Sequence, residues 1–75
     1  MENSRWGRRI RAYRKLKRIS QIELAKELEV APATLGKMER GVKEPTATQW
    51  TKIAHVLGIA IDELKGQEEG EESDT

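Results

Sequence analysis

The 75-residue chain contains no cysteine, no phenylalanine, only two prolines and a single histidine. Without cysteine it has neither a disulfide framework nor a thiolate metal site, a composition that fits a reducing cytosol. No apolar run approaches the ~20 residues that a membrane-spanning helix needs. The basic N-terminus has no apolar segment of the kind found in signal peptides. We therefore expect one small cytoplasmic domain in which every apolar residue contributes to the core.

The residue sets that enzymes and metalloproteins use are also missing. We find no nucleophile with a base and an orienting group, no glycine-rich phosphate loop and no metal-ligand spacing. Asp62 and Glu63 are adjacent, so on a helix their carboxylates diverge and cannot work as an acid–base pair. His55 has no cysteine or carboxylate cluster around it and is expected to be solvated. We predict that the chain is not an enzyme and holds no metal or cofactor.

The charged residues are divided between the two ends of the chain. The first 18 residues hold eight Arg or Lys and one Glu, a net charge of +7, whereas residues 66–75 carry −5. Such a basic end indicates a polyanionic partner, although a merely solvated surface would show the same composition. The acidic segment has no apolar anchor, so we predict a domain at residues 1–65 followed by a disordered tail at 66–75.

Apolar periodicity predicts five helices and therefore an all-α fold. The predicted helices span residues 4–17, 21–28, 32–40, 47–57 and 59–64. Asn3 or Ser4 is expected to cap the first helix. Its inner stripe includes Ile10, and its last turn is expected to add the aliphatic stem of Lys17. Trp50 lies on the inner stripe of the fourth helix, and we interpret it as a core residue rather than a platform for a base.

Residues 20–41 have the pattern of two short helices joined by a tight turn, a helix-turn-helix. Ser20 is a good N-cap, and Glu23 three residues later completes a capping box. Pro32 stands in the first turn of the second helix, where its missing N–H costs little. Gly41 stops that helix at the position that follows the C-cap.

Two segments in this region carry a family pattern, Q-I-E-L-A-K-E-L and V-A-P-A-T-L-G-K-M-E-R-G. They resemble the helix-turn-helix of the phage repressor and Cro-like (Xre-type) DNA-binding domains. The positions that agree are Gln21, Leu24, Ala25, Leu28, Val30, Leu35, Glu39 and Gly41. The resemblance extends from about Trp6 to Leu64. It implies a compact five-helix repressor-like bundle in a prokaryotic or phage-encoded transcriptional regulator, most often a repressor.

The resemblance also implies how DNA is bound. The helix at 32–40 enters the major groove, and the first turn of the helix at 21–28 receives a phosphate. The residues expected to face the bases are Ala31, Pro32, Ala33, Thr34 and Lys37. Gly36 is expected to point outward beside them. Those expected to contact phosphates are Arg11, Arg14, Arg18, Ser20, Gln21, Arg40 and Lys43. In the family, Arg14 also forms a structural ion pair with Glu39.

The base-facing positions depart from the family pattern. Members that read sequence directly carry Gln, Asn, Arg, Ser or Thr there, and bidentate side chains supply most base discrimination. Here the helix offers one lysine, one threonine and small apolar groups. We therefore expect weak direct readout, with a homodimer on DNA as the binding unit. The alternative is a protein-interaction module, of antitoxin or antagonist type, on a helix-turn-helix scaffold.

The acidic tail generates a first prediction. Deleting residues 67–75 is expected to tighten binding to mixed-sequence duplex DNA at low salt, because the tail no longer competes with the DNA for the basic end. Fluorescence anisotropy of a labelled duplex measures the effect, which should fade as salt screens the charges. A tail of equal length with its acids changed to Gln or Asn serves as the control and should behave like the deletion. An affinity that does not change contradicts the prediction.

Overall fold

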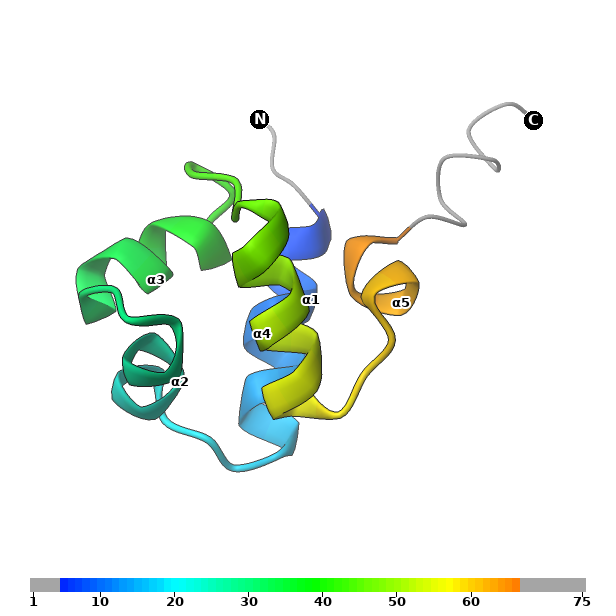
Figure 1. Ribbon diagram of the computed structural model, residues 1–75, viewed down its shortest axis with the longest axis horizontal. Coiled ribbons are helices and arrows are strands. Elements are labelled where there is room, and N and C mark those ends of the chain that lie inside the picture. The colour runs from blue at the N-terminus through cyan, green and yellow to red at the C-terminus, as the bar shows by residue number, and fades with distance from the viewer. Residues whose placement is uncertain (1–4, 67–75) are drawn as a thin grey trace.

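The computed structural model describes residues 5–66, which form five α-helices and no strand (Figure 1). They are α1 (Arg5–Leu16), α2 (Gln21–Leu28), α3 (Pro32–Glu39), α4 (Ala47–Leu57) and α5 (Ile61–Lys65). The predicted all-α, five-helix fold is confirmed. The proposed caps at Asn3 or Ser4 and the segment 67–75 lie outside the described residues. Within residues 5–66, no helix is long and apolar enough to cross a bilayer.

The helix ends follow local signals in the sequence. Ser20 Oγ accepts a hydrogen bond from the Glu23 N–H at 3.0 Å, and the Glu23 carboxylate accepts one from the Ser20 N–H at 2.7 Å. Thr46 and Gln49 form the same capping box at the start of α4. Gly41 directly follows the C-cap of α3 and has a φ of +80°, in the left-handed region that favours glycine. The largest boundary error is at α5, which begins at Ile61 rather than at residue 59, because the Ala60 N-cap before it has extended backbone. The ends of α1, α3 and α5 each differ from the prediction by one residue.

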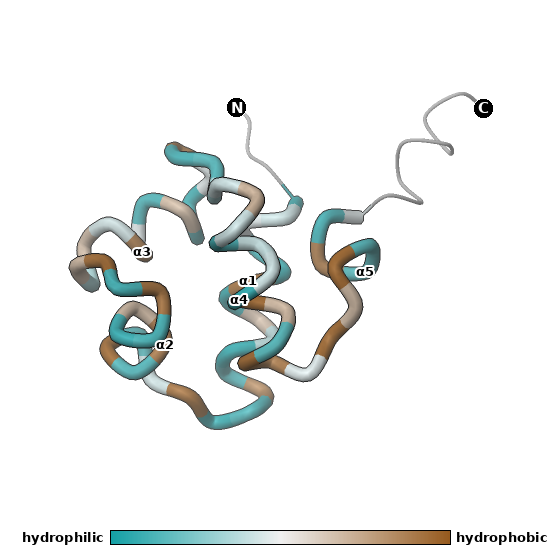
Figure 2. The backbone as a smooth tube through the Cα atoms, viewed as in Figure 1, coloured by the Kyte–Doolittle hydropathy of each residue, from teal (hydrophilic) through white to brown (hydrophobic). Residues whose placement is uncertain are grey.

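One apolar core joins the five helices. α1 and α4 lie side by side, with α2 and α3 packed on one flank and α5 on the other (Figure 1). Hydrophobic residues recur along every helix (Figure 2). The side chains with essentially no exposed surface are Ile10, Leu24, Leu35, Met38, Ile53, Leu57 and Leu64. Lys17 was wrongly expected to extend this inner stripe: α1 ends at Leu16, and Lys17 is exposed.

Trp50 is a core residue, as predicted. It is buried and meets Trp6 edge to face, with ring centroids 5.6 Å apart. The Lys65 Nζ lies 5.5 Å from the Trp50 ring centroid, within the range of a cation–π contact. This aromatic pair therefore connects the start of α1 to α4 and to the end of α5.

Gly7 allows α1 to approach the end of α3 closely. A Cβ at this position would lie 2.7 Å from the main-chain oxygens of both Met38 and Glu39, and 3.0 Å from the Gly41 nitrogen. Because these neighbours are main-chain atoms, they cannot move aside as the end of a flexible side chain can. The absence of a side chain at Gly7 thus sets the distance between the two helices.

Two helical glycines provide a matched stability test. Gly7→Ala is expected to destabilise the domain by about 1–3 kcal/mol, because overpacking outweighs the ~1 kcal/mol of helix propensity that alanine adds. Gly36→Ala adds the same propensity, yet its Cβ would meet only side-chain atoms at 3.4 and 3.5 Å. It should leave stability unchanged or raise it by up to about 1 kcal/mol. Urea unfolding followed by circular dichroism measures both. Equal stabilities for the two variants contradict this account.

Candidate nucleic-acid interface

The site is built on a buried ion pair between α1 and α3. Arg14 Nε donates to Glu39 Oε2 at 2.7 Å, and Arg14 Nη2 donates to Glu39 Oε1 at 3.3 Å. The two residues are only 8% and 5% exposed. Arg14 Nη1 also donates to the main-chain oxygen of Ile19 at 3.0 Å. One guanidinium therefore holds α1, the end of α3 and the segment that leads into α2.

Gln21 joins the first turn of α2 to the same carboxylate. Its Nε2 donates to Glu39 Oε1 at 3.2 Å. The Gln21 amide and the guanidinium of Arg40 come together over Gly36, whose missing Cβ would lie 3.5 Å from Gln21 Nε2 and 3.4 Å from Arg40 Nη1. The expectation that Gly36 points outward is therefore wrong: it is buried, because side chains from α2 and from the C-cap of α3 cover it.

The start of α2 has main-chain donors available for an anion. The capping box uses the N–H groups of Ser20 and Glu23. The Leu24 N–H makes the first intrahelical bond, to the Ser20 oxygen at 3.0 Å. The N–H groups of Gln21 and Ile22 precede that bond and point out of the helix end, where the helix dipole favours negative charge.

The outer side of α3 matches the predicted base-facing set in part. Ala31, Pro32, Ala33 and Lys37 are exposed, whereas Thr34 is half-buried. The loop after α3 folds back onto its last turn, since the N–H groups of Val42 and Lys43 both donate to the Lys37 oxygen, at 2.8 and 3.3 Å. The exposed Lys43 is thereby held close to the end of α3.

Val42 is a surface residue that the sequence reasoning did not single out. It is 69% exposed in the loop between Arg40 and Lys43. An apolar side chain in an otherwise polar loop directly after Gly41 was the signal that could have found it.

The basic residues of α1 and of the connection that follows it lie in different environments. Arg11, with Arg8 and Lys15, lines a shallow hollow of about 390 Å³ that contains no carboxylate. Arg9 instead donates to the main-chain oxygen of Glu63 at 2.7 Å and so binds the end of α5. Arg18 lines another hollow whose walls include Glu23 and Glu27. The basic residues among the first 18 therefore do not form one continuous anion-binding surface.

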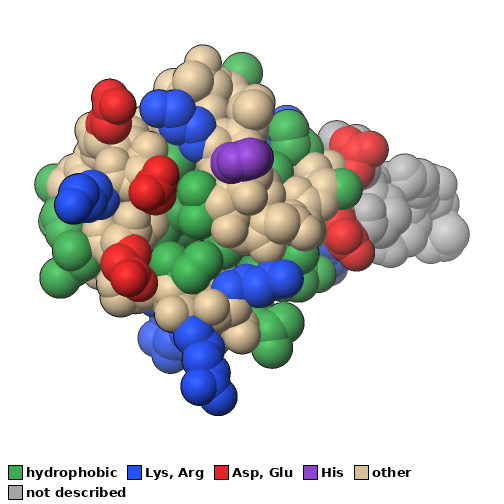
Figure 3. Space-filling model, turned by 60° about the horizontal axis from the view of Figure 1, so that its bottom comes forward, with side chains coloured by type: hydrophobic (Ala, Val, Ile, Leu, Met, Phe, Trp, Pro, Cys, Tyr) green, Lys and Arg blue, Asp and Glu red, His purple; other side chains and the backbone are tan. Residues whose placement is uncertain are grey.

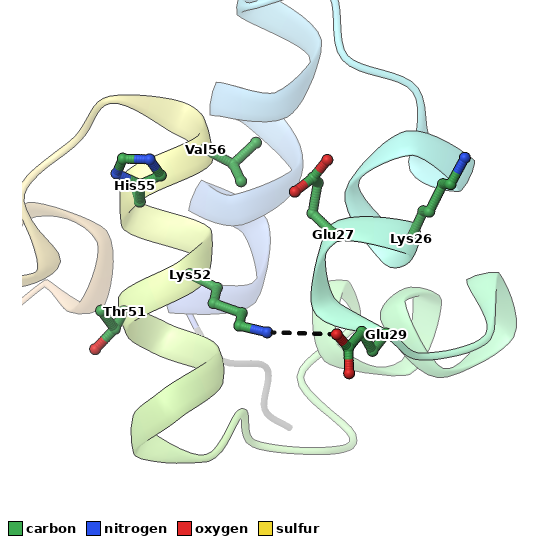
Figure 4. A pocket seen from close by; sticks show the side chains of 7 residues that line it. All are labelled: Lys26, Glu27, Glu29, Thr51, Lys52, His55 and Val56. Atoms are coloured by element: carbon green, nitrogen blue, oxygen red, sulfur yellow. Dashed lines mark ion pairs between the residues drawn. The ribbon is translucent and has the colours of Figure 1, made fainter.

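A separate groove of about 470 Å³ lies between α2 and α4 (Figure 4). Its lining consists of Lys26, Glu27, Glu29, Thr51, Lys52, His55 and Val56. Lys52 and Glu29 form an ion pair across it at 3.9 Å. Seen from this side, mixed charges surround apolar side chains, and His55 is exposed (Figure 3). The groove shares no residue with the predicted DNA contacts. Among residues 5–66 no cluster of His, Cys, Asp and Glu could hold a metal.

Comparison with known proteins identifies the family of this chain. A helix-turn-helix family profile matches residues 10–64. The chain is 48% identical over 64 residues to the uncharacterized HTH-type transcriptional regulator YazB of Bacillus subtilis, covering 85% of this chain and 93% of YazB. It is also 31% identical over 62 residues to the immunity repressor protein of Bacillus phage phi105. That match covers 83% of this chain, and this chain spans only 43% of the repressor's length.

Solved structures share the fold. The DNA-binding domain of the P22 c2 repressor superposes with a TM-score of 0.77 and 33% identity, covering 88% of each chain. The biofilm master regulator SinR, solved in complex with DNA, superposes with a TM-score of 0.70 and 35% identity. That match covers 79% of this chain and 95% of the SinR chain.

The buried ion pair yields a stability prediction. Arg14→Met leaves the Glu39 carboxylate buried without its cation and should cost about 3–5 kcal/mol. The double variant Arg14→Met/Glu39→Met removes both charges and should be more stable than Arg14→Met alone. Urea unfolding of the wild type, both single variants and the double variant gives the coupling energy. Purely additive effects of the two substitutions would show that the pair does not act as a unit.

Proposed function

The chain belongs to the helix-turn-helix family of transcriptional regulators, and from this premise we propose that it is a DNA-binding repressor that docks α3 in the major groove. The curated relatives are a transcriptional regulator and an immunity repressor, in agreement with the expectation that the chain is not an enzyme. Repression follows from occupancy of the DNA. The protein acts in the bacterial cytoplasm, where its DNA is.

The observation that carries the proposal is the meeting of Gln21 and Arg40 over Gly36. The Gln21 amide at the start of α2 and the Arg40 guanidinium at the end of α3 each lie within 3.5 Å of the place that a Cβ on Gly36 would take. Gln21 also carries one of the outward main-chain N–H groups of α2. A phosphate at this point receives main-chain donors, the positive end of the α2 dipole and a cation. Such contacts fix the register of a protein on the duplex.

Other cations extend the contact along the backbone. Arg11 stands on α1 beside Arg8 and Lys15, and Lys43 is held near the end of α3 by the loop hydrogen bonds. Arg14 acts differently: it is committed to Glu39 and to the Ile19 oxygen, so it positions the phosphate-binding groups. The N-cap role of Ser20 likewise orders the first turn of α2. Arg18 would reach a phosphate only by leaving its place beside the α2 carboxylates.

Two copies of the chain would bind one operator. A single α3 with one lysine and one threonine on its outer side makes few base contacts. A homodimer doubles the phosphate contacts and places two copies of α3 in successive major grooves, about 34–36 Å apart.

The exposed apolar start of α3 supports a second candidate function. Ala31, Pro32 and Ala33 would suit a protein antagonist or partner as well as a base edge. In that case the helix-turn-helix would serve as a scaffold for a protein interface, and the chain would bind duplex DNA weakly or not at all.

The salt dependence of DNA binding tests the proposal. Anisotropy of a labelled mixed-sequence duplex, titrated at several salt concentrations, should give a slope of log K against log salt of several units, at about −0.9 for each phosphate neutralised. Arg40→Ala should weaken binding to every sequence alike and reduce the slope by about one. Lys26→Ala in the α2–α4 groove removes an equal charge and should change neither quantity. Equal losses for the two variants, or no binding at low salt, would overturn the proposal.

A further inference from the structure

We propose that two copies of this chain associate through Leu16, which inserts into the depression between α2 and α4 of the other copy. The contact requires no DNA. It uses neither α3 nor the Gln21 and Arg40 groups of the proposed phosphate site, so the inference goes beyond the proposed function.

Leu16 is a large apolar side chain that the fold leaves in water. It is the last residue of α1 and is 71% exposed. Two main-chain hydrogen bonds hold this helix end. The Arg18 N–H donates to the Lys15 oxygen at 3.0 Å, in a turn where Arg18 has a φ of +62°. The Ile19 N–H donates to the Arg14 oxygen at 3.0 Å, and Ile19 packs against the core. These bonds form a Schellman motif, which fixes Leu16 in place on the surface.

The two hollows beside α2 form one continuous depression. The groove of about 470 Å³ between α2 and α4 and the hollow of about 520 Å³ beside Arg18 share Lys26, Glu27 and Val56 as lining residues. Val56 points into the space between the two helices (Figure 4). Ile19 adds a second apolar side chain to the wall. Each volume exceeds that of a leucine side chain, so an apolar side chain from outside can be buried there.

Unpaired charges of opposite sign occur at the two places. Lys15 and Lys17 flank Leu16, and both are exposed. Within residues 5–66 neither lysine side chain has a hydrogen bond or an ion pair. Glu27 also has no such partner among these residues, and its carboxylate points into the depression (Figure 4). An incoming Leu16 therefore brings two unpaired cations towards one unpaired carboxylate, which favours this occupant.

The lysines that line the depression leave Glu27 available. Lys52 is paired with Glu29 across the groove at 3.9 Å. The Lys26 side chain points away from α4 (Figure 4). A lysine that arrives beside Leu16 is therefore the cation that completes the charge pattern at Glu27.

Leu16 and the depression adjoin on each copy. Arg18 and Ile19 line the depression, and they follow Leu16 by two and three residues. Two copies related by a two-fold axis exchange the contact, with each Leu16 in the depression of the other copy. Such an interface closes on itself and gives a dimer rather than an open chain.

The oligomeric state of the full chain without DNA tests the inference. Sedimentation equilibrium over a range of protein concentrations gives the dissociation constant of the dimer. Leu16→Ser should raise this constant by about tenfold or more, because a buried leucine side chain is lost from the contact. Val42→Ser is the matched control, since Val42 is 69% exposed in the loop after α3, and it should leave the constant unchanged. Circular dichroism should show the same fold for both variants, because both side chains are exposed.

A charge exchange tests which groups meet. Glu27→Lys places a cation opposite the lysines around Leu16 and should weaken the dimer. Lys17→Glu places a carboxylate opposite Glu27 and should also weaken it. The double variant pairs the two charges again across the interface, so it should associate more tightly than either single variant.

Three results would overturn the inference. A wild-type chain that stays monomeric at millimolar concentration excludes the dimer. A dimer that Leu16→Ser and Val42→Ser affect equally is built on another surface. A double charge variant that associates no better than the single variants removes the contact between Lys17 and Glu27. None of these results decides the proposed function, which the DNA titration at low salt tests separately.

Discussion

The ion pair between Arg14 and Glu39 is the interaction on which the proposed DNA-binding surface depends. Both charges are buried, and a buried charge is tolerated only when it is paired and its remaining hydrogen-bonding groups are satisfied. Here the guanidinium also binds the Ile19 oxygen, and the carboxylate also binds the Gln21 amide. These partners come from α1, from the end of α3 and from both sides of the α2 cap. The pair is worth more for orientation than for net stability, because it holds the first turn of α2 against α3.

In the proposed complex, groups that contact the DNA backbone outnumber groups that read bases. The main-chain amides at the start of α2, Arg40 and the cations around Arg11 and Lys43 would contact phosphates, which are the same at every sequence. The outer side of α3 carries one lysine, one threonine and small apolar side chains, so it would make few base contacts. Such a division favours a dimer in the proposed complex, because two copies of α3 make twice as many base contacts as one.

The basic residues of α1 have different structural roles, which composition alone does not distinguish. Arg9 binds a main-chain oxygen at the end of α5, and Arg14 is buried in the ion pair. Arg11 faces outward among other cations. Charge in this protein is therefore partly structural, and a count of Arg and Lys overstates the number of groups available to a polyanion.

The sequence by itself determined the helices, their caps and the family pattern. The caps depend on residues within about one helical turn, and the helices and the family pattern depend on the spacing of residues along the chain. Ser20 with Glu23, Thr46 with Gln49, and Gly41 at the end of α3 all act locally, and the apolar stripes predicted a core residue such as Trp50. Only the tertiary structure decided that Gly36 is covered, that Arg9 binds the Glu63 oxygen and that Val42 stands exposed. These features depend on how close the helices pass, and at Gly7 that distance is set by a Cβ that would collide with the main chain of α3. No periodicity in the sequence encodes such a crossing, because the atoms that define it come from segments more than 30 residues apart.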